Sequence, residues 1–336
     1  MTNQLVRQRT LGIAREDDAT KGTAVALATG HCVSVESGIL RAEVEQKVDE
    51  SSVARIESGV GLFVPKEWSS LKFKAPVKTN WLGHVLAGLL GTVSSANAGG
   101  ETLVRDHTLS VSSSTVMPAY TFFMLGQTVS EKATYGTFRK LKLEVDAGGI
   151  MMAEVEAIAQ AMESATGTAA FSADYHFQSS HGSIKLATAL ANLAAASAVS
   201  FHRLVLEIER ELTPQWVFGS NEYNTVIGGK LTITGELQIL HADNTYRDYF
   251  TDATDKAMRI AFQNPTTIGS AEKPELTLDL AKIIVTSHER SDAADDVDIE
   301  TIGFKALWDL DEGTPSMISS VVLTNKEAAT AYTEPA

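Results

Sequence analysis

The stretch that decides the fold spans residues 200–242 and reads SFHRLVLEIERELTPQWVFGSNEYNTVIGGKLTITGELQILHA. Two runs in it place apolar residues on alternate positions: Leu204, Leu206, Ile208 and Leu212, then Leu231, Ile233, Leu237 and Ile239. Because successive side chains of a strand point to opposite faces, this period of two predicts two half-buried β-strands. Turns are expected at Gly219 and at the pair Gly228 and Gly229. An antiparallel pair is the simplest arrangement, since parallel strands need a longer crossover.

The polar side of the two runs is rich in glutamate. Glu207, Glu209 and Glu211 share one face of the first predicted strand, and Glu236 lies on the polar face of the second. Two carboxylates at a controlled separation are what glycoside hydrolysis requires. Active-site carboxylates rarely form a regular ladder, however, and like charges side by side repel one another. We therefore interpret the four glutamates as a solvated acidic face.

Other segments predict further strands and a few helices. Residues 138–146 alternate strictly, and 150–163 are expected to return beside them as a hairpin. The best helix covers 80–91, where Asn80 can cap the first turn and Gly91 can end the last. Shorter helices are expected within 185–198 and 245–255, and a loop is expected over 92–100.

These elements amount to about ten to twelve strands, which predicts a mainly β fold. We expect an antiparallel β-sandwich or barrel with one to three short peripheral helices. Residues 1–30 have no sustained period and are expected to form an N-terminal arm. Residues 31–325 form one β-sandwich domain with loop insertions, and 326–336 form a polar C-terminal tail. The alternating blocks at 138–160 and 202–240 leave a weak duplication open.

Composition excludes several classes of protein. The chain has 336 residues, of which 44% are hydrophobic, and no apolar run long enough to cross a bilayer, so no membrane partner is expected. The first residues lack the apolar stretch of a signal peptide. A net charge of −14 without a basic run argues against tight binding of nucleic acid. The single cysteine, Cys32, rules out an internal disulfide and is interpreted as a small buried residue.

Signatures of catalysis or cofactor binding are weak. There is no glycine-rich dinucleotide fingerprint, phosphate-binding loop or nucleophile elbow. His176 and His181 lie near Asp174, but the set is a poor metal site. The acidic loop Asp292, Asp295, Asp296 and Asp298 lacks the glycine and terminal glutamate of a calcium-binding EF-hand loop. We expect no enzyme activity, no metal and no cofactor.

The order of segments resembles the tail tube protein family of long-tailed bacteriophages, over about residues 20–325. The resemblance lies in the turn Glu36-Ser37-Gly38, the helix end Leu89-Leu90-Gly91, and Tyr135-Gly136 leading into FRKLKLEVDAGG. SFHRLVLEIERELTP, a loop, GGKLTITGELQIL and an aromatic helix follow.

The resemblance implies a structural subunit that self-assembles into stacked rings, usually hexameric, around a channel that conducts DNA. It implies a place in the virion tail after assembly in the bacterial cytoplasm. The implied partners are further copies of the chain, tape measure, tail terminator and distal tail proteins, and passing DNA that is not bound specifically. On this interpretation Glu207, Glu209, Glu211 and Glu236 line the channel and repel phosphates.

Two alternatives stay open. One is a carbohydrate- or ligand-binding β-sandwich of a phage accessory or adhesin protein, for which Trp216, Phe218 and Tyr223 would supply an aromatic patch. The other is a β-sandwich glycosidase that uses the glutamates described above. A tube subunit assembles without any ligand, whereas a binding module stays small, so the state of assembly separates the readings.

Overall fold

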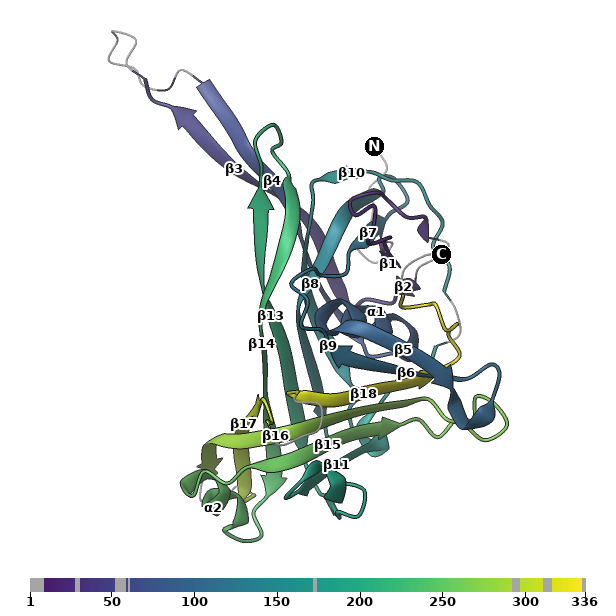
Figure 1. Cartoon of the computed structure of the whole chain (residues 1–336), viewed down its shortest axis with the longest axis vertical. Coiled ribbons are helices and arrows are strands. Elements are labelled where there is room, and N and C mark those ends of the chain that lie inside the picture. The colour runs from purple at the N-terminus through teal and green to yellow at the C-terminus, as the bar shows by residue number, and fades with distance from the viewer. Residues whose placement is uncertain are drawn as a thin grey trace.

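The computed structural model describes residues 9–27, 31–51, 59, 61–171, 174–291, 297–310 and 316–333. It confirms a mainly β fold with antiparallel strands and short helices (Figure 1). The first strands are β1 (Thr10–Arg15), β2 (His31–Val33), β3 (Ser37–Asp49), β4 (Gly61–Pro76), β5 (Gly91–Asn97), β6 (Arg105–Val111), β7 (Tyr120–Leu125), β8 (Glu131–Asp146), β9 (Met152–Ala159) and β10 (Met162–Ser164). The others are β11 (Gly182–Ala187), β12 (Ala198–Val199), β13 (Arg203–Trp216), β14 (Tyr223–Leu240), β15 (Lys256–Gln263), β16 (Glu275–Arg290), β17 (Ile299–Leu307) and β18 (Ile318–Asn325). The α-helices are α1 (Thr79–Leu90) and α2 (Thr245–Thr251), and 3-10 turns lie at Ala98–Gly100, Ser179–His181 and Leu190–Asn192.

A run of eight hydrogen-bonded strands extends across the fold in the order β3-β4-β9-β8-β13-β14-β17-β16. Every neighbouring pair in this run is antiparallel. The predicted pairing of the two central strands is confirmed, and Arg203 of β13 lies opposite Gln238 of β14. The predicted hairpin return after residue 149 is confirmed as β9. A second layer contains β1, β2, β7, β10 and the first half of β8.

Helix α1 is the centre of the core, and all of its residues are buried. The helix ends at Gly91, as predicted. The φ of this residue is 99°, and this left-handed conformation turns the chain out of the helix and into β5. Asn80, however, lies inside the helix and does not cap it. Asp174 takes that role from a distant loop: its Oδ1 accepts the Asn80 N–H at 3.0 Å and the Thr79 hydroxyl at 2.8 Å.

Three local predictions were wrong. Residues 91–97 form strand β5 instead of a loop, because β6 supplies a backbone partner that the small polar residues do not reveal. Residues 185–198 hold the end of β11, a 3-10 turn and the start of β12 instead of a helix. Gly228 and Gly229 lie inside β14, beside the register shift between Arg210 and Leu212, so the hairpin turns only at 217–222. The short helix expected within 245–255 is confirmed as α2.

Both ends of the described chain enter the core. Strand β1 pairs with β2 and β7, and Leu11 and Ile13 are fully buried, so this part of the expected arm belongs to the sheet. Residues 1–8 and 28–30 of that arm lie outside the described residues. Tyr332, in the expected polar tail, is buried as well. Both segments bury apolar or aromatic side chains although neither has a sustained alternating sequence pattern, so the sequence did not predict their place in the core.

Candidate assembly surfaces

The polar face of the eight-strand run carries carboxylates and cations in alternation. Lys72 of β4 reaches Glu154 at 2.7 Å and Glu156 at 2.9 Å, both on β9. On the next strands, Lys140 of β8 reaches Glu207 of β13 at 2.8 Å. Cross-strand pairs of opposite charge stabilise a sheet modestly when they are exposed.

Further pairs extend the pattern to the end of β13. Arg203 contacts Glu144, and it reaches Asp146 at 3.3 Å. Arg139 lies 3.5 Å from Glu209. The Arg203 guanidinium holds the pKa of Glu144 below its usual range. The glutamates in the sequence predicted a purely acidic face. In the structure, this face instead carries ion pairs between carboxylates and cations of neighbouring strands.

The four predicted glutamates are not equivalent in the structure. Glu207 and Glu209 follow each other along β13 and both engage cations of β8. Glu211 is exposed at the register shift, where no residue of β14 lies directly opposite. Glu236 lies between Val205 of β13 and a glycine of β17. The structure thus brings three of them to one strand and the fourth to its neighbour.

Two strand edges of the eight-strand run are open among the described residues. Strand β3 pairs along its length with β4 alone. At the other end of the run, the C-terminal half of β16 pairs with β17 alone. Open edges present unpaired N–H and C=O groups, which are a template for a strand of another chain.

Apolar side chains are exposed at opposite ends of the molecule. The hairpins β3–β4 and β13–β14 project together from one end, and α2 lies at the other (Figure 1). The hairpin end exposes Leu62, Phe63, Val217 and Phe218, the last of them completely. The α2 end exposes Leu240, Phe250 and Val297. Exposed apolar side chains that gather at an end of a molecule are typical of interaction sites.

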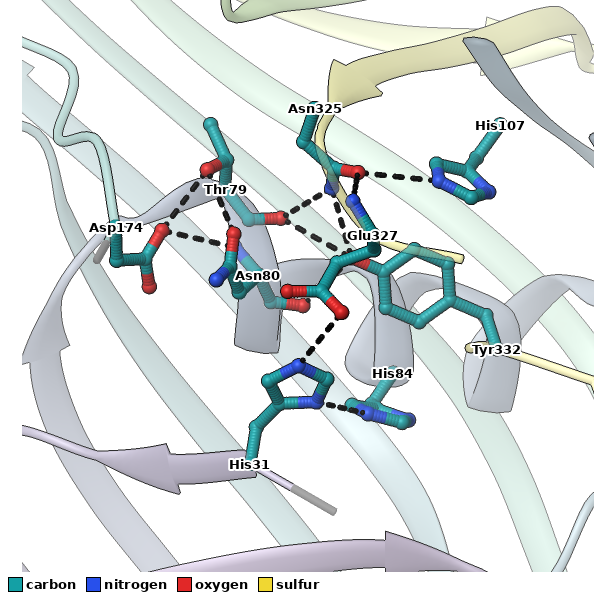
Figure 2. Close-up of polar contacts among 9 residues, drawn as sticks. All are labelled: His31, Thr79, Asn80, His84, His107, Asp174, Asn325, Glu327 and Tyr332. Carbon is teal, nitrogen blue, oxygen red and sulfur yellow. Dashed lines mark hydrogen bonds and ion pairs between the residues drawn. The ribbon is translucent and has the colours of Figure 1, made fainter. Parts of the chain in front are cut away.

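A buried polar network ties the C-terminal segment to α1 (Figure 2). His31 Nδ1 lies 2.7 Å from His84 Nε2, and its Nε2 lies 3.1 Å from a carboxylate oxygen of Glu327. Burial holds the pKa of His84 well below its usual value. Asn325 donates to the Thr79 carbonyl at 3.1 Å. Since this network lies against a fully buried helix, its role is structural.

The weaker chemical candidates do not assemble into sites. His176 and His181 have ring centroids 6.5 Å apart, and Asp174 is turned toward α1 instead. Within the part of the chain that the structure describes, no group of three metal-ligating side chains occurs. Burial raises the pKa of the Cys32 thiol, which is partly buried, so the thiol is not activated.

The other sequence candidates are dispersed in the same way. Asp292, Asp295 and Asp296 lie outside the described residues, while Asp298 pairs with Arg290. The aromatic patch that the alternative ligand-binding module would need is not formed, because Tyr223 is buried and Phe218 is fully exposed to solvent. Trp216 packs on Trp68 with ring centroids 6.2 Å apart.

Sequence reasoning missed the two open edges and the apolar ends. Only a pairing scheme reveals an edge, and apolar residues at hairpin tips look like ordinary strand residues. The one available signal was the run Leu62-Phe63-Val64, which does not alternate.

Comparison with known proteins identifies the family of the chain. A family model described as phage tail tube protein matches residues 7–306. A search of curated proteins finds no match. No helix among the described residues is long and apolar enough to cross a membrane. The chain therefore belongs to the phage tail tube protein family, whose members are structural components of virion tails.

Proposed function

We propose that this chain is the repeating subunit of a hollow tail tube, in which copies close side by side into rings, the rings stack, and DNA passes through the lumen. The observation that carries the proposal is the run of eight antiparallel strands with an open edge at each end. A tube wall built from several chains needs such a sheet, because each chain must hydrogen-bond to a neighbour on both sides.

The number of strands in the run supports ring closure. Strands alternate in direction along it, so the first and the eighth strand, β3 and β16, run in opposite directions. When β16 of one copy meets β3 of the next, the pair is again antiparallel. This head-to-tail contact uses two different edges, and such contacts close into rings when the rotation permits.

Stacking of rings uses the two apolar ends. The hairpin end of one ring, with Phe63 and Phe218, meets the α2 end of the next, with Leu240 and Phe250. Because the two surfaces lie at opposite ends of one molecule, the contact repeats without limit and gives a tube. At each end of the tube, the last ring leaves one of these two apolar surfaces uncovered. That surface contacts tape measure, tail terminator or distal tail proteins.

The charged face of the sheet suits the lumen. Glu207, Glu209, Glu211 and Glu236 lie on this face. The nearby cations Lys140, Arg139 and Arg203 are engaged by carboxylates. DNA-binding proteins gain affinity when Lys and Arg neutralise phosphates and release counterions. A cation that is already paired with a carboxylate gains less from a phosphate, so DNA slides past without adhering.

The first experiment is negative-stain electron microscopy of the purified protein over a range of concentrations. Rings or hollow tubes, formed without any ligand, are expected. Single molecules at every concentration would contradict self-assembly and would favour a ligand-binding module, to be tested on a glycan array.

A second experiment tests the lumen. Tubes of the double variant Glu209→Lys and Glu211→Lys are expected to retain labelled double-stranded DNA on sedimentation at low salt, whereas wild-type tubes release it. Glu163→Lys is the matched control, since Glu163 is exposed on β10 in the other layer. Equal retention by the double variant and the control would show that the glutamates do not face the lumen.

A further inference from the structure

The strand-pairing scheme of the first half of the chain recurs in the second half. Strands β1, β2, β3 and β4 and helix α1 correspond to β11, β12, β13 and β14 and helix α2. Strands β7, β8, β9 and β10 correspond in turn to β15, β16, β17 and β18. The order along the chain is the same in both halves. Only the hairpin β5–β6 of the first half has no counterpart.

Seven antiparallel pairings occur once in each half. In the first half β1 pairs with β2 and β7, β4 with β3 and β9, and β8 with β7, β9 and β10. In the second half β11 pairs with β12 and β15, β14 with β13 and β17, and β16 with β15, β17 and β18. Two unrelated halves would not share a complete scheme of long-range pairings.

Finer features of the strands agree as well. The first halves of β8 and β16 pair with one set of strands and their second halves with another, so each long strand joins two layers. The pairing β8–β9 shifts register between Phe138 and Lys140, and β16–β17 shifts between Val285 and Ser287. Both long hairpins also shift register, after Glu45 in β3 and after Arg210 in β13.

Two strand pairings join the two halves. One pairs β18 with β6, which belongs to the hairpin without a counterpart. The other joins strands that both belong to the repeat: β8 of the first half lies beside β13 of the second. In the scheme of the repeat, the strand equivalent to β8 is β16 and the strand equivalent to β13 is β3. These are the two strands with open edges. The internal junction therefore shows how one repeat binds the next.

We propose that the chain is a tandem duplication of one tube unit, that β16 of each copy pairs with β3 of the next copy as β8 pairs with β13, and that three chains supply the six units of a ring. The proposal rests on the tube function proposed above and specifies its partner and contact. It makes the ring a trimer with approximate six-fold symmetry.

The register of the internal junction predicts that of the junction between chains. Within the chain, Lys140 lies opposite Glu209 and Lys142 opposite Glu207. The register shifts in β8 and β16 make Phe138 and Val285 equivalent positions of the two halves. In β13 and β3, the buried Leu206 is equivalent to the buried Leu40.

Carried over on this alignment, Ser287 of one copy lies opposite Glu43 of the next, and Glu289 lies opposite Arg41. Both Glu289 and Arg41 are exposed. The junction between chains thus keeps a cross-strand pair of opposite charge, with the signs exchanged relative to Lys142 and Glu207.

The width of the lumen also favours three chains. Three runs of eight strands at about 4.8 Å spacing give a wall of about 115 Å circumference, or about 37 Å in backbone diameter without strand tilt. Side chains narrow this bore, yet it still admits a DNA duplex of about 20 Å. By the same spacing, two chains give about 24 Å, which side chains would largely fill, and six give about 73 Å.

Disulfide cross-linking counts the chains in a ring. The variant carries Ser287→Cys and Glu43→Cys in a Cys32→Ser background, and assembled rings are oxidised and run on a denaturing, non-reducing gel. The expected ladder ends at three chains, about 108 kDa for three copies of a 36.0 kDa chain. The matched control is Lys140→Cys with Glu209→Cys, which lie opposite each other within one chain and form an internal disulfide without a ladder.

Each other result has a distinct meaning. A ladder that ends at six chains overturns the trimer while the tube function stands. Assembled rings without any cross-link, beside a cross-linked control, overturn the β16–β3 junction. Absence of rings in wild-type protein contradicts the tube function itself.

Charge exchange tests the same junction without cysteine. Glu289→Arg alone and Arg41→Glu alone are each expected to raise the protein concentration needed for ring formation at least several-fold, because like charges then face each other. The double variant is expected to restore assembly to near the wild-type concentration. Failure of the double variant to assemble better than either single variant would overturn the predicted register.

Discussion

The hydroxyl of Tyr332 donates a hydrogen bond of 2.8 Å to the backbone carbonyl of Asn80, although 252 residues separate the two. This bond fastens the C-terminal segment to the first turn of α1. The ring of Tyr332 also occupies the space beside Gly83, where a Cβ would lie only 2.2 Å from a ring carbon. The helix that organises the core is therefore shaped to receive the end of the chain.

Replacement of Gly83 by alanine is expected to destabilise the fold. The added methyl group collides with Tyr332, and overpacking of this kind costs about 1–3 kcal/mol. Urea unfolding of the unassembled protein measures the loss. In a Tyr332→Leu background the same substitution should cost less, because the ring is gone. An equal cost in both backgrounds would show that Tyr332 does not cause the collision.

Asp174→Ala is expected to lower stability by about 1–3 kcal/mol, since the change removes the acceptor of the Asn80 N–H in the first turn of α1. Asp174 accepts bonds from Thr79, Asn80 and its neighbour Tyr175. Asp174→Asn keeps an acceptor oxygen and should lose less. Unfolding by urea at neutral pH compares the three proteins, and equal losses for the two variants would contradict capping.

The stability of the fold is expected to fall as the pH drops below about 6.5, the usual pKa of histidine. Burial, aided by His31 and Arg15, holds the pKa of His84 well below that value in the folded chain. Between the two pKa values the unfolded chain binds a proton that the folded chain refuses, so acid favours unfolding.

His84→Gln is expected to weaken this loss by up to about 1.4 kcal/mol per pH unit. The measurement is the free energy of unfolding at pH 7.5 and at pH 5.5. His202→Gln is the matched control, because His202 is exposed. If the free energy of unfolding falls as steeply with pH in His84→Gln as in the control, His84 does not cause the loss of stability in acid.

Phe218→Ser is expected to shorten tubes without preventing rings. The side chain of Phe218 is completely exposed in the single molecule, so its loss leaves the fold intact. Electron microscopy measures tube length, and Val129→Ser, at an exposed site between β7 and β8, serves as control. Tubes of Phe218→Ser as long as those of the control would exclude this residue from the stacking contact.

Local patterns in the sequence predicted the strands well. The alternation in residues 203–216 and 223–240 predicted two strands, their antiparallel pairing and the faces on which Leu206 and Glu207 lie. That success has a simple cause, since side-chain direction along a strand depends only on position in the chain. Strand β5 escaped prediction because its residues lack such a pattern and depend on β6 for their order.

The sequence by itself determined the fold class, the polar character of one face of the eight-strand run and the end of α1 at Gly91. Only the tertiary structure decided which cations neutralise Glu207 and Glu209, which residue caps α1, and which strand edges stay open. It also revealed a repeat of strand pairings that differs from the duplication left open by the sequence. Residues 138–160 correspond to β16 and β17, and residues 202–240 correspond to β3 and β4, so the two alternating blocks are not equivalent to each other. The physical reason is that period and turn chemistry act between near neighbours, whereas ion pairs, caps and strand edges join residues tens to hundreds of positions apart.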